Sequence, residues 1–198
     1  ISGGPNMDDT TKFRIDFLKK NNHISYYIVD GGEEPFSELI TWLKNNKETD
    51  IPKNIIYLKK NGELFSSGRR PLKKEANHIS SPYLNGYLDE FLDLNMVPLL
   101  ETNRGCPYRC TFCDQKFPLF RQRSPQSFVD EVRRNYDQHG IREFDIYDST
   151  FTAGRKRVRE ICDGLEEQNL DVGFTIRSRV DSVNEKVLDA LKRGGCHT

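Results

Sequence analysis

The sequence lacks the marks of a membrane or secreted protein. No stretch of the 198 residues approaches the run of about 18 apolar residues that spans a bilayer, and no basic-then-apolar leader opens the chain. An excess of one charge is also missing, because 30 basic side chains balance 30 acidic ones. The composition therefore gives no general reason to expect a nucleic acid or an anionic membrane as partner. We expect a soluble, cytoplasmic protein.

Cysteine is scarce and unevenly placed. The chain has five cysteines, and none of them lies in residues 1–105. An odd number argues against a secreted disulfide framework, whereas clustered cysteines in a reducing compartment are more often metal ligands or catalytic groups. Three of the five, Cys106, Cys110 and Cys113, fall within eight positions in RGCPYRCTFC. We expect the other two, Cys162 and Cys196, to be small buried core residues.

The first part of the chain alternates strand and helix patterns, which indicates an α/β layer. After the turn at Gly3-Gly4-Pro5, DDTTKFRIDFLKKN predicts a helix, residues 23–30 a strand, and FSELITWLKNN a second helix. NIIYLKKNGELFSSG then predicts a hairpin, in which Asn61-Gly62 favours a type I′ turn. Residues 69–98 follow as a connector that includes the basic run RRPLKK.

A second alternation begins at MVPLLETNRG. Helices are predicted at about 125–139, 154–168 and 183–193, with strands in REFDIYD and VGFTIRSR between them. Three β-α units in series imply parallel strands joined by right-handed crossovers. Chemistry in such sheets collects at the carboxyl ends of the strands, and the three clustered cysteines follow the first of these strands.

Three thiols without an obvious fourth ligand favour an iron–sulfur cluster over structural zinc. A closed zinc site needs four protein ligands, and the nearest candidates, Asp114 and His139, are adjacent in sequence and at a helix end respectively. A 4Fe-4S cluster held by three cysteines instead leaves one iron open to an external chelator. A zinc-stabilised, non-catalytic binding module, with RRPLKK contacting nucleic acid, remains the alternative.

These residues carry a resemblance to a known family. The C-x-x-x-C-x-x-C spacing, with Phe112 directly before Cys113, resembles the signature loop of the radical S-adenosylmethionine (SAM) superfamily. ISSPYLNGYLDEF followed by ETNRGCPYRCTFC resembles the connector and first barrel strand of the cobalamin-binding branch. Upstream, ISGGP and VDGGEEPFSELI look like the end of a cobalamin-binding domain; downstream, REFDIYDSTFT and TIRSRVDSVNEKVLDALKRGGC are similar to later barrel units.

The resemblance implies a fold and its division. Residues 1–50 would form the C-terminal part of a Rossmann-like cobalamin-binding domain, residues 51–97 a hairpin and interdomain connector, and residues 98–198 about half of a radical SAM (β/α)6 barrel. Because ISGGP reads as the tail of a strand and LKRGGCHT stops where another strand would start, we expect an internal fragment.

The resemblance also implies cofactors and site residues. Cys106, Cys110 and Cys113 would hold the 4Fe-4S cluster, whose open iron binds SAM for reductive cleavage to a 5′-deoxyadenosyl radical. The implied SAM contacts are Phe112, Asp148, Ser149, and Arg177 or Arg179, of which at most one arginine faces the site because the two alternate on a strand. Gly3 and Gly4 would lie beside the cobalamin tail. Asp148 has a second interpretation as a helix cap.

The implied activity is cobalamin-dependent methyl transfer to a small-molecule substrate, with flavodoxin or ferredoxin as a typical electron donor and no nucleic acid. The sequence departs from the branch in one respect, since none of its four histidines lies in an Asp-x-His-x-x-Gly motif. A methylthiotransferase is the rival within enzymes. Its upstream domain carries cysteines for a second cluster, and residues 1–105 have none, which makes it the weaker interpretation.

Overall fold

The computed structural model describes residues 1–198 except 5–8, 72, 74, 95, 114–118 and 198. Contacts within the chain divide it into two compact units, Ile1–Pro71 and Leu72–Thr198. Each unit has its own sheet and its own hydrophobic core, so that each is stabilised by contacts within itself.

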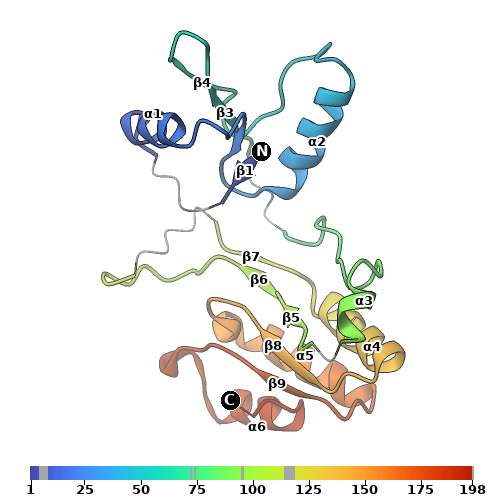
Figure 1. The fold of residues 1–198 in the computed structure, drawn as a ribbon. Helices are drawn as coiled ribbons and strands as arrows, with labels where there is room; N and C mark the ends of the chain where they lie inside the picture. Colours follow the sequence, from blue (N-terminus) through green and yellow to red (C-terminus); the bar gives the residue numbers. More distant parts are fainter. Residues whose placement is uncertain (5–8, 72, 74, 95, 114–118, 198) are drawn as a thin grey trace. The chain divides into compact units, whose positions relative to one another are not determined.

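The first unit is built on a four-stranded mixed sheet (Figure 1). Its order is β1-β2-β3-β4, where β1 is Ser2–Gly3, β2 is Tyr27–Ile28, β3 is Ile55–Leu58 and β4 is Leu64–Ser66. Strands β1 and β2 are parallel, whereas β2, β3 and β4 pair antiparallel. The predicted strand at 23–30 is therefore present, but only its last part enters the ladder.

Two helices cover opposite faces of this sheet, as Figure 1 shows. They are α1, Thr11–Lys20, and α2, Glu33–Lys44. Successive strand residues point to opposite faces. Accordingly, one face packs Leu18 of α1 against Tyr27, Val29 and Ile56, and the other packs Leu39 of α2 against Ile28 and Ile55.

The β3–β4 hairpin is confirmed, but its turn type is not the one predicted. A type I′ turn needs positive φ at both central residues, whereas in this turn only Gly62 has it, at 82°. The amide of Gly62 donates to the carbonyl of Lys59, and the amide of Lys59 donates to the carbonyl of Glu63. This pattern is a type I turn followed by a bulge at the glycine. The predicted positive φ is therefore confirmed for Gly62 and wrong for Asn61.

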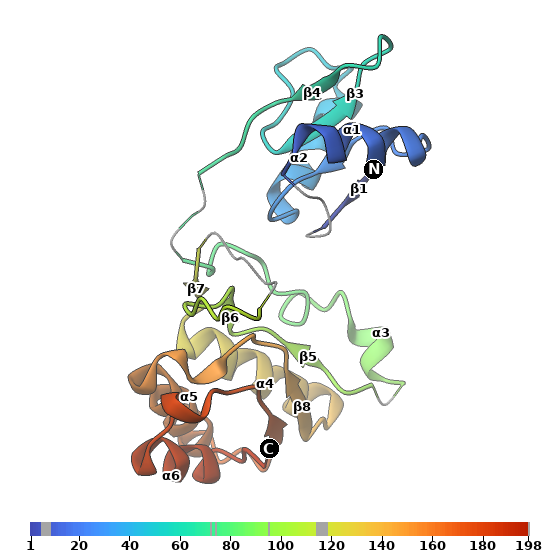
Figure 2. The same ribbon diagram turned by 90° about the vertical axis from the view of Figure 1, so that its left-hand side faces the viewer.

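The second unit contains a three-stranded parallel sheet in the order β5-β8-β9. Figure 1 labels all three strands, and Figure 2 shows β5 and β8 from a second side. The strands are β5, Leu99–Leu100; β8, Glu143–Ile146; and β9, Gly173–Thr175. Between and after them run α4, Pro125–His139; α5, Arg155–Glu167; and α6, Glu185–Arg193. Short helices α3, Asp89–Leu92; η1, Phe151–Ala153; and η2, Val180–Ser182 complete the unit. The predicted β-α series is confirmed.

All three long helices pack on one face of this sheet. Leu100, Phe144, Ile146 and Phe174 from the strands join apolar residues of α4, α5 and α6 in one core. The opposite face is polar or exposed: Leu99 is 56% exposed and Tyr147 65%. A helix layer on one side and an open face on the other is the arrangement of part of an α/β barrel.

The structure groups the middle of the chain differently from the sequence-based division. The hairpin at β3 and β4, which the sequence assigned to the connector, extends the sheet of the first unit through the pair Tyr27–Ile56. Tyr83 and Leu92, also assigned to the connector, belong to the core of the second unit. Backbone pairing and apolar burial, neither visible in composition, cause the difference.

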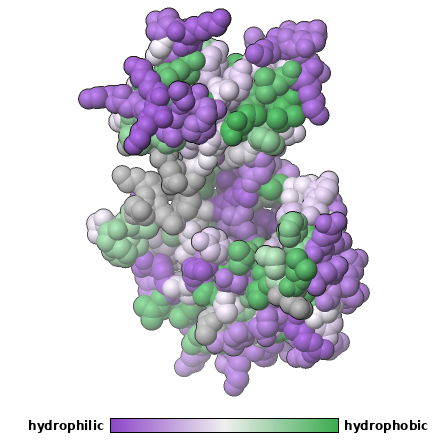
Figure 3. Space-filling view, viewed as in Figure 1, coloured by the Kyte–Doolittle hydropathy of each residue, from purple (hydrophilic) through white to green (hydrophobic). Residues whose placement is uncertain are grey.

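Within the described ranges, no helix combines the length and apolarity needed to cross a bilayer. Hydrophilic side chains cover much of the visible face of each unit, with hydrophobic patches between them (Figure 3).

Candidate functional site

The cysteines lie on a loop whose two ends are tied together. Strand β6, Asn103–Arg104, pairs antiparallel with β7, Arg121–Gln122, just after the carboxyl end of β5. We call residues 105–120 the cysteine loop, residues 102–104 and 121–123 its stem, and residues 106–113 its tip. The loop therefore starts where parallel sheets collect their chemistry, as predicted.

The tip presents three free thiols. Cys106 and Cys110 are half-buried and Cys113 is exposed, and none is in a disulfide. Among the described residues, the structure does not gather three or more metal-binding side chains into a preformed site. The donor set itself fits an iron–sulfur cluster, because three unpaired thiols on one short segment are soft ligands that can turn toward a common metal.

Arg179 is the arginine that reaches this tip. Its Nη1 donates to Cys110 Sγ at 3.1 Å, and its guanidinium lies 4.2 Å from the ring centre of Tyr108. Asp181 holds the other side of the fork, with Nε–Oδ1 and Nη2–Oδ2 distances of 2.9 and 2.6 Å. These hydrogen bonds to Asp181 raise the pKa of Arg179 above its usual value, so the side chain carries its charge to the cysteines.

Arg177 has a different environment on the open face of the sheet. Its Nη1 donates to the carbonyl of Ile146 at 3.2 Å, and its guanidinium stacks 4.6 Å from the ring centre of Tyr147. Ser149 is exposed just beyond the end of β8. The structure thus separates the two arginines and brings only Arg179 to a cysteine. The reason given from strand alternation was wrong, because residues two apart face the same side of a strand; both arginines lie beyond the end of β9 at Thr175, where the alternation no longer holds.

Asp148 points the other way, toward the helix layer. It is 1% exposed and accepts four hydrogen bonds from Thr102 and Asn103. Burial raises the pKa of Asp148, which these donors and nearby Arg157 partly offset. Its contact with the SAM amino group remains a prediction. The structure gives it no support, because both carboxylate oxygens are engaged within the protein. The helix-cap interpretation is not what the structure shows either.

Phe112 is 91% exposed, next to Cys113. A bare aromatic ring of this kind has no packing role in the described structure and is available to cover a bound group. Its predicted position against adenine or the cluster remains a prediction.

Gly3 and Gly4 lie at the carboxyl end of β1, beside the end of β2. A side chain at Gly3 would stand 3.1 Å from the carbonyl oxygen of Ile28, and Gly4 has a φ of 130° that favours glycine. Because β1 and β2 are parallel, a second glycine pair, Gly31-Gly32, follows the same edge. Two bare backbone segments at one edge fit a ligand tail, although strand packing alone already explains Gly3.

The candidate ligands for the zinc interpretation find no support. Asp114 lies outside the described residues. The ring nitrogens of His139 contact Asp93 and Asp89 at 3.0 and 3.2 Å, at the far end of α4 from the stem.

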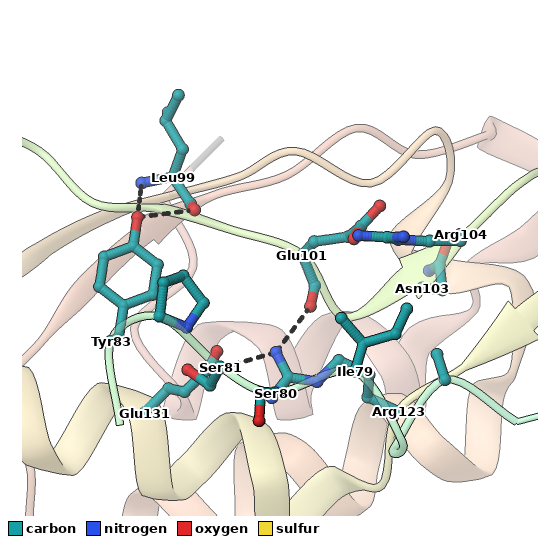
Figure 4. Close-up of a pocket in the computed structure, with 12 residues that line it drawn as sticks. Ile79, Ser80, Ser81, Tyr83, Leu99, Glu101, Asn103, Arg104, Arg123 and Glu131 are labelled. Carbon is teal, nitrogen blue, oxygen red and sulfur yellow. Dashed lines mark hydrogen bonds and ion pairs between the residues drawn. The ribbon is translucent and has the colours of Figure 1, made fainter. Parts of the chain in front are cut away.

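A cavity of about 170 Å³ lies beside the stem (Figure 4). Ala76, Ile79–Tyr83, Glu101, Arg104 and Glu131 of α4 are among the residues that line it. Within it, Arg123 Nη1 lies 2.7 Å from the buried carboxylate of Glu131. The volume is below the roughly 300–1,000 Å³ of ligand pockets, and no cysteine of the tip lines it. We therefore do not regard it as the substrate site.

Comparison with protein families now identifies the chain. The model of the radical SAM superfamily matches residues 100–198, which contain the cysteine loop, β8, β9 and the second residue of β5. The chain belongs to the radical SAM superfamily. The resemblance drawn from the cysteine motif is thereby confirmed.

Relatives of this radical SAM chain extend the likeness upstream of the matched residues. An uncharacterized methyltransferase from Pyrococcus horikoshii is 30% identical over 100% of this chain and 43% of its own length. The anaerobic magnesium-protoporphyrin IX monomethyl ester cyclase of Rubrivivax gelatinosus is 26% identical over 90% of this chain and 34% of its own. The chain therefore spans less than half of either relative.

A solved structure supports the fold. The radical SAM chain superposes on the cobalamin-dependent SAM radical enzyme OxsB, determined with aqua-cobalamin and SAM bound, with a TM-score of 0.72. The match covers 99% of this chain and 30% of that chain at 21% identity.

Sequence reasoning missed the residues that hold the stem, namely Thr102, Asn103 and Arg157. One signal was available: Phe144 and Ile146 are apolar and alternate along β8, so that Asp148 continues their buried face and Ser149 does not. That Thr102 would meet Asp148 could not be read from the sequence, because 46 residues separate them.

Proposed function

We propose that the protein is a radical SAM enzyme whose 4Fe-4S cluster is held by Cys106, Cys110 and Cys113, and that it is a cobalamin-dependent methyltransferase. When bound, the cluster would supply the electron for reductive cleavage of one SAM to methionine and a 5′-deoxyadenosyl radical, and cobalamin would carry a methyl group taken from a second SAM, which leaves as S-adenosylhomocysteine. The observation that carries the proposal is the position of the three free thiols, on a loop closed at the carboxyl end of β5.

The chain's own residues would bind and orient SAM. Arg179 is the better candidate for its carboxylate, because its guanidinium carries a positive charge to within 3.1 Å of Cys110 Sγ. Its Nε and Nη2 are bonded to Asp181, so the carboxylate would take Nη1. Ser149 stays a candidate for the amino group, since it is exposed just beyond the carboxyl end of β8. Phe112 would cover adenine or the cluster and exclude water from the sulfurs.

Cobalamin binding rests on the first unit. The two glycine pairs at the carboxyl edge of β1 and β2 would let a nucleotide tail approach the backbone, as ligands do in Rossmann-like sheets. Similarity to a chain solved with aqua-cobalamin supports the same assignment. A small-molecule substrate and a one-electron donor such as flavodoxin or ferredoxin complete the proposed reaction.

Anaerobic reconstitution with iron and sulfide tests the cluster. We expect about four irons per chain and methionine release from SAM upon reduction, both lost in Cys110→Ala. The matched control is Cys196→Ala, which removes a thiol outside the loop and should keep its iron. A Cys110→Ala protein with a full cluster would refute the ligand assignment; one zinc per chain without iron would favour the binding module, and about eight irons a methylthiotransferase.

Similarity to the Rubrivivax cyclase favours ring closure as a second reaction class. Isotope labelling separates the two. With methyl-labelled SAM and cobalamin, a methyltransferase moves the label into product, whereas a cyclase leaves it in methionine.

A further inference from the structure

A buried polar cluster clamps the stem of the cysteine loop. The cluster consists of Thr102, Asn103, Asp148 and Arg157, each less than a tenth exposed. Asp148 Oδ1 accepts the backbone amides of Thr102 and Asn103 at 2.7 and 3.0 Å. Its Oδ2 accepts the hydroxyl of Thr102, and the side-chain amide of Asn103 at 2.7 Å.

Arg157 completes the cluster from α5. Its Nη1 donates to Thr102 Oγ1 at 3.1 Å, and its Nη2 donates to the carbonyls of Thr102 and Arg123 at 2.9 and 3.0 Å. Thr102 belongs to the incoming half of the stem and Arg123 to the outgoing half. One guanidinium therefore fixes both ends of the cysteine loop to the same helix.

The hydroxyl of Thr102 links two opposite buried charges. It donates to the carboxylate of Asp148 and accepts from the guanidinium of Arg157. A buried charge is costly unless it is paired and hydrogen-bonded, and each partner here removes that cost from the other. Such an arrangement is sensitive to single substitutions, because removing one member leaves the others unsatisfied.

We propose that Asp148, through Thr102 and together with Arg157, is a positioning residue that holds the stem so that Cys106, Cys110 and Cys113 are presented for one cluster geometry. Cys106 lies two residues beyond the stem, so displacement of Thr102 and Asn103 reaches the first ligand directly. The part of the inference that concerns the cluster rests on the proposed function. The part that concerns the order of the stem does not.

Asp148→Asn is the sharpest probe, because it keeps the shape and exchanges one acceptor for a donor. If the oxygen of the new side chain accepts the two backbone amides, its NH2 group must face the side-chain NH2 group of Asn103. Two donors would then oppose each other without an acceptor. Rotating Asn103 would lose its bond to the carbonyl of Thr150, which is 3.1 Å long. The matched control is Asp163→Asn on α5, which removes only an exposed ion pair with Arg193.

The first measurement is amide hydrogen exchange of the full-length protein without its cluster. In Asp148→Asn we expect exchange in the stem to rise by about tenfold while α4 is unchanged, and neither to change in Asp163→Asn. Unchanged stem exchange would overturn the inference, as would an equal rise in α4, since that indicates general destabilisation. This result stands even if the wild-type protein takes up no iron, an outcome that would refute the proposed function alone.

The second measurement is the electron paramagnetic resonance spectrum of the reconstituted, reduced protein. The wild-type protein should give one species, and folded Asp148→Asn either several species or at most about half of the iron. If Asp148→Asn does not fold, Thr102→Val and Thr102→Ser decide the matter: the first removes the hydroxyl and should disorder the stem, whereas the second keeps it and should restore exchange to within about twofold of wild type. Equal behaviour of these two variants would show that the hydroxyl link plays no part.

Discussion

The stem and the tip of the cysteine loop differ sharply although a few residues separate them. In the stem, Thr102 and Asn103 are 0% and 2% exposed and their polar groups are held by Asp148. At the tip, Phe112 is 91% exposed, and the three sulfurs do not form a preformed site among the described residues. The protein thus fixes where the loop begins and ends, and leaves the tip to be ordered by what binds there.

Thiol chemistry should show the largest contrast between interior and tip. Burial raises the pKa of Cys162 to about 12, so at pH 8 only about one molecule in ten thousand carries its thiolate. In the metal-free, reduced protein we expect iodoacetamide to label exposed Cys113 at least about a thousandfold faster. Peptide mass spectrometry at timed intervals measures both rates. Equal rates would mean that the core around Cys162 opens readily.

An aromatic residue behind the stem should matter far more to stability than the one at the tip. Phe151, 0% exposed and 6.1 Å from the ring of Phe174, begins η1 directly after Thr150. Phe151→Ala should lower the free energy of unfolding by about 3–5 kcal/mol, because it removes a fully packed ring. Urea denaturation followed by circular dichroism gives the value. A loss below about 1 kcal/mol would show that this region is loosely packed.

Arg179 connects the tip to the third β-α unit, and its loss should have an intermediate effect. Arg179→Gln should raise the KM for SAM by about tenfold, since a charged hydrogen bond contributes about 1.5–3 kcal/mol when fully formed. Iron content should stay at the wild-type value if the side chain serves SAM. A parallel loss of iron would instead indicate that Arg179 acts through its hydrogen bond to Cys110. Arg159→Gln, on the exposed face of α5, is the control.

The smallest effect is expected at Phe112. Because its ring is exposed, Phe112→Ala should change the free energy of unfolding of the metal-free protein by less than about 0.5 kcal/mol. The same urea experiment as for Phe151→Ala provides the comparison. A larger loss would mean that the tip is already packed before a cofactor arrives.

The sequence predicted the tip of the cysteine loop but not the contacts that hold its stem. The spacing of Cys106, Cys110 and Cys113 and the pattern of the helix at 125–139 are local features, and they were read correctly as a loop after a strand and as a helix. The stem depends on Asp148 and Arg157, which are 46 and 55 residues from Thr102. Local periodicity carries no information about which polar groups will meet at such separations.

The structure also explains why sequence reasoning missed the buried contacts of Asp148. The resemblance placed YDST at the ligand and treated Asp148 and Ser149 as equivalent, although neighbouring strand residues face opposite sides. The prediction of a type I′ turn was wrong for a different reason. Asn-Gly is compatible with more than one hairpin loop length, and only the pairing of Leu58 with Leu64 selects the loop length that is found.

The antiparallel pairing of β6 and β7 also allows the cysteine loop to change in length during evolution independently of the parallel sheet. Since Asn103 pairs with Gln122 and Arg104 with Arg121, residues inserted between them lengthen an excursion whose ends are already joined. Doubling such a segment costs only about 0.6 kcal/mol in closure entropy. Descendants of this chain could therefore enlarge or reshape the cysteine loop without rebuilding the parallel strands.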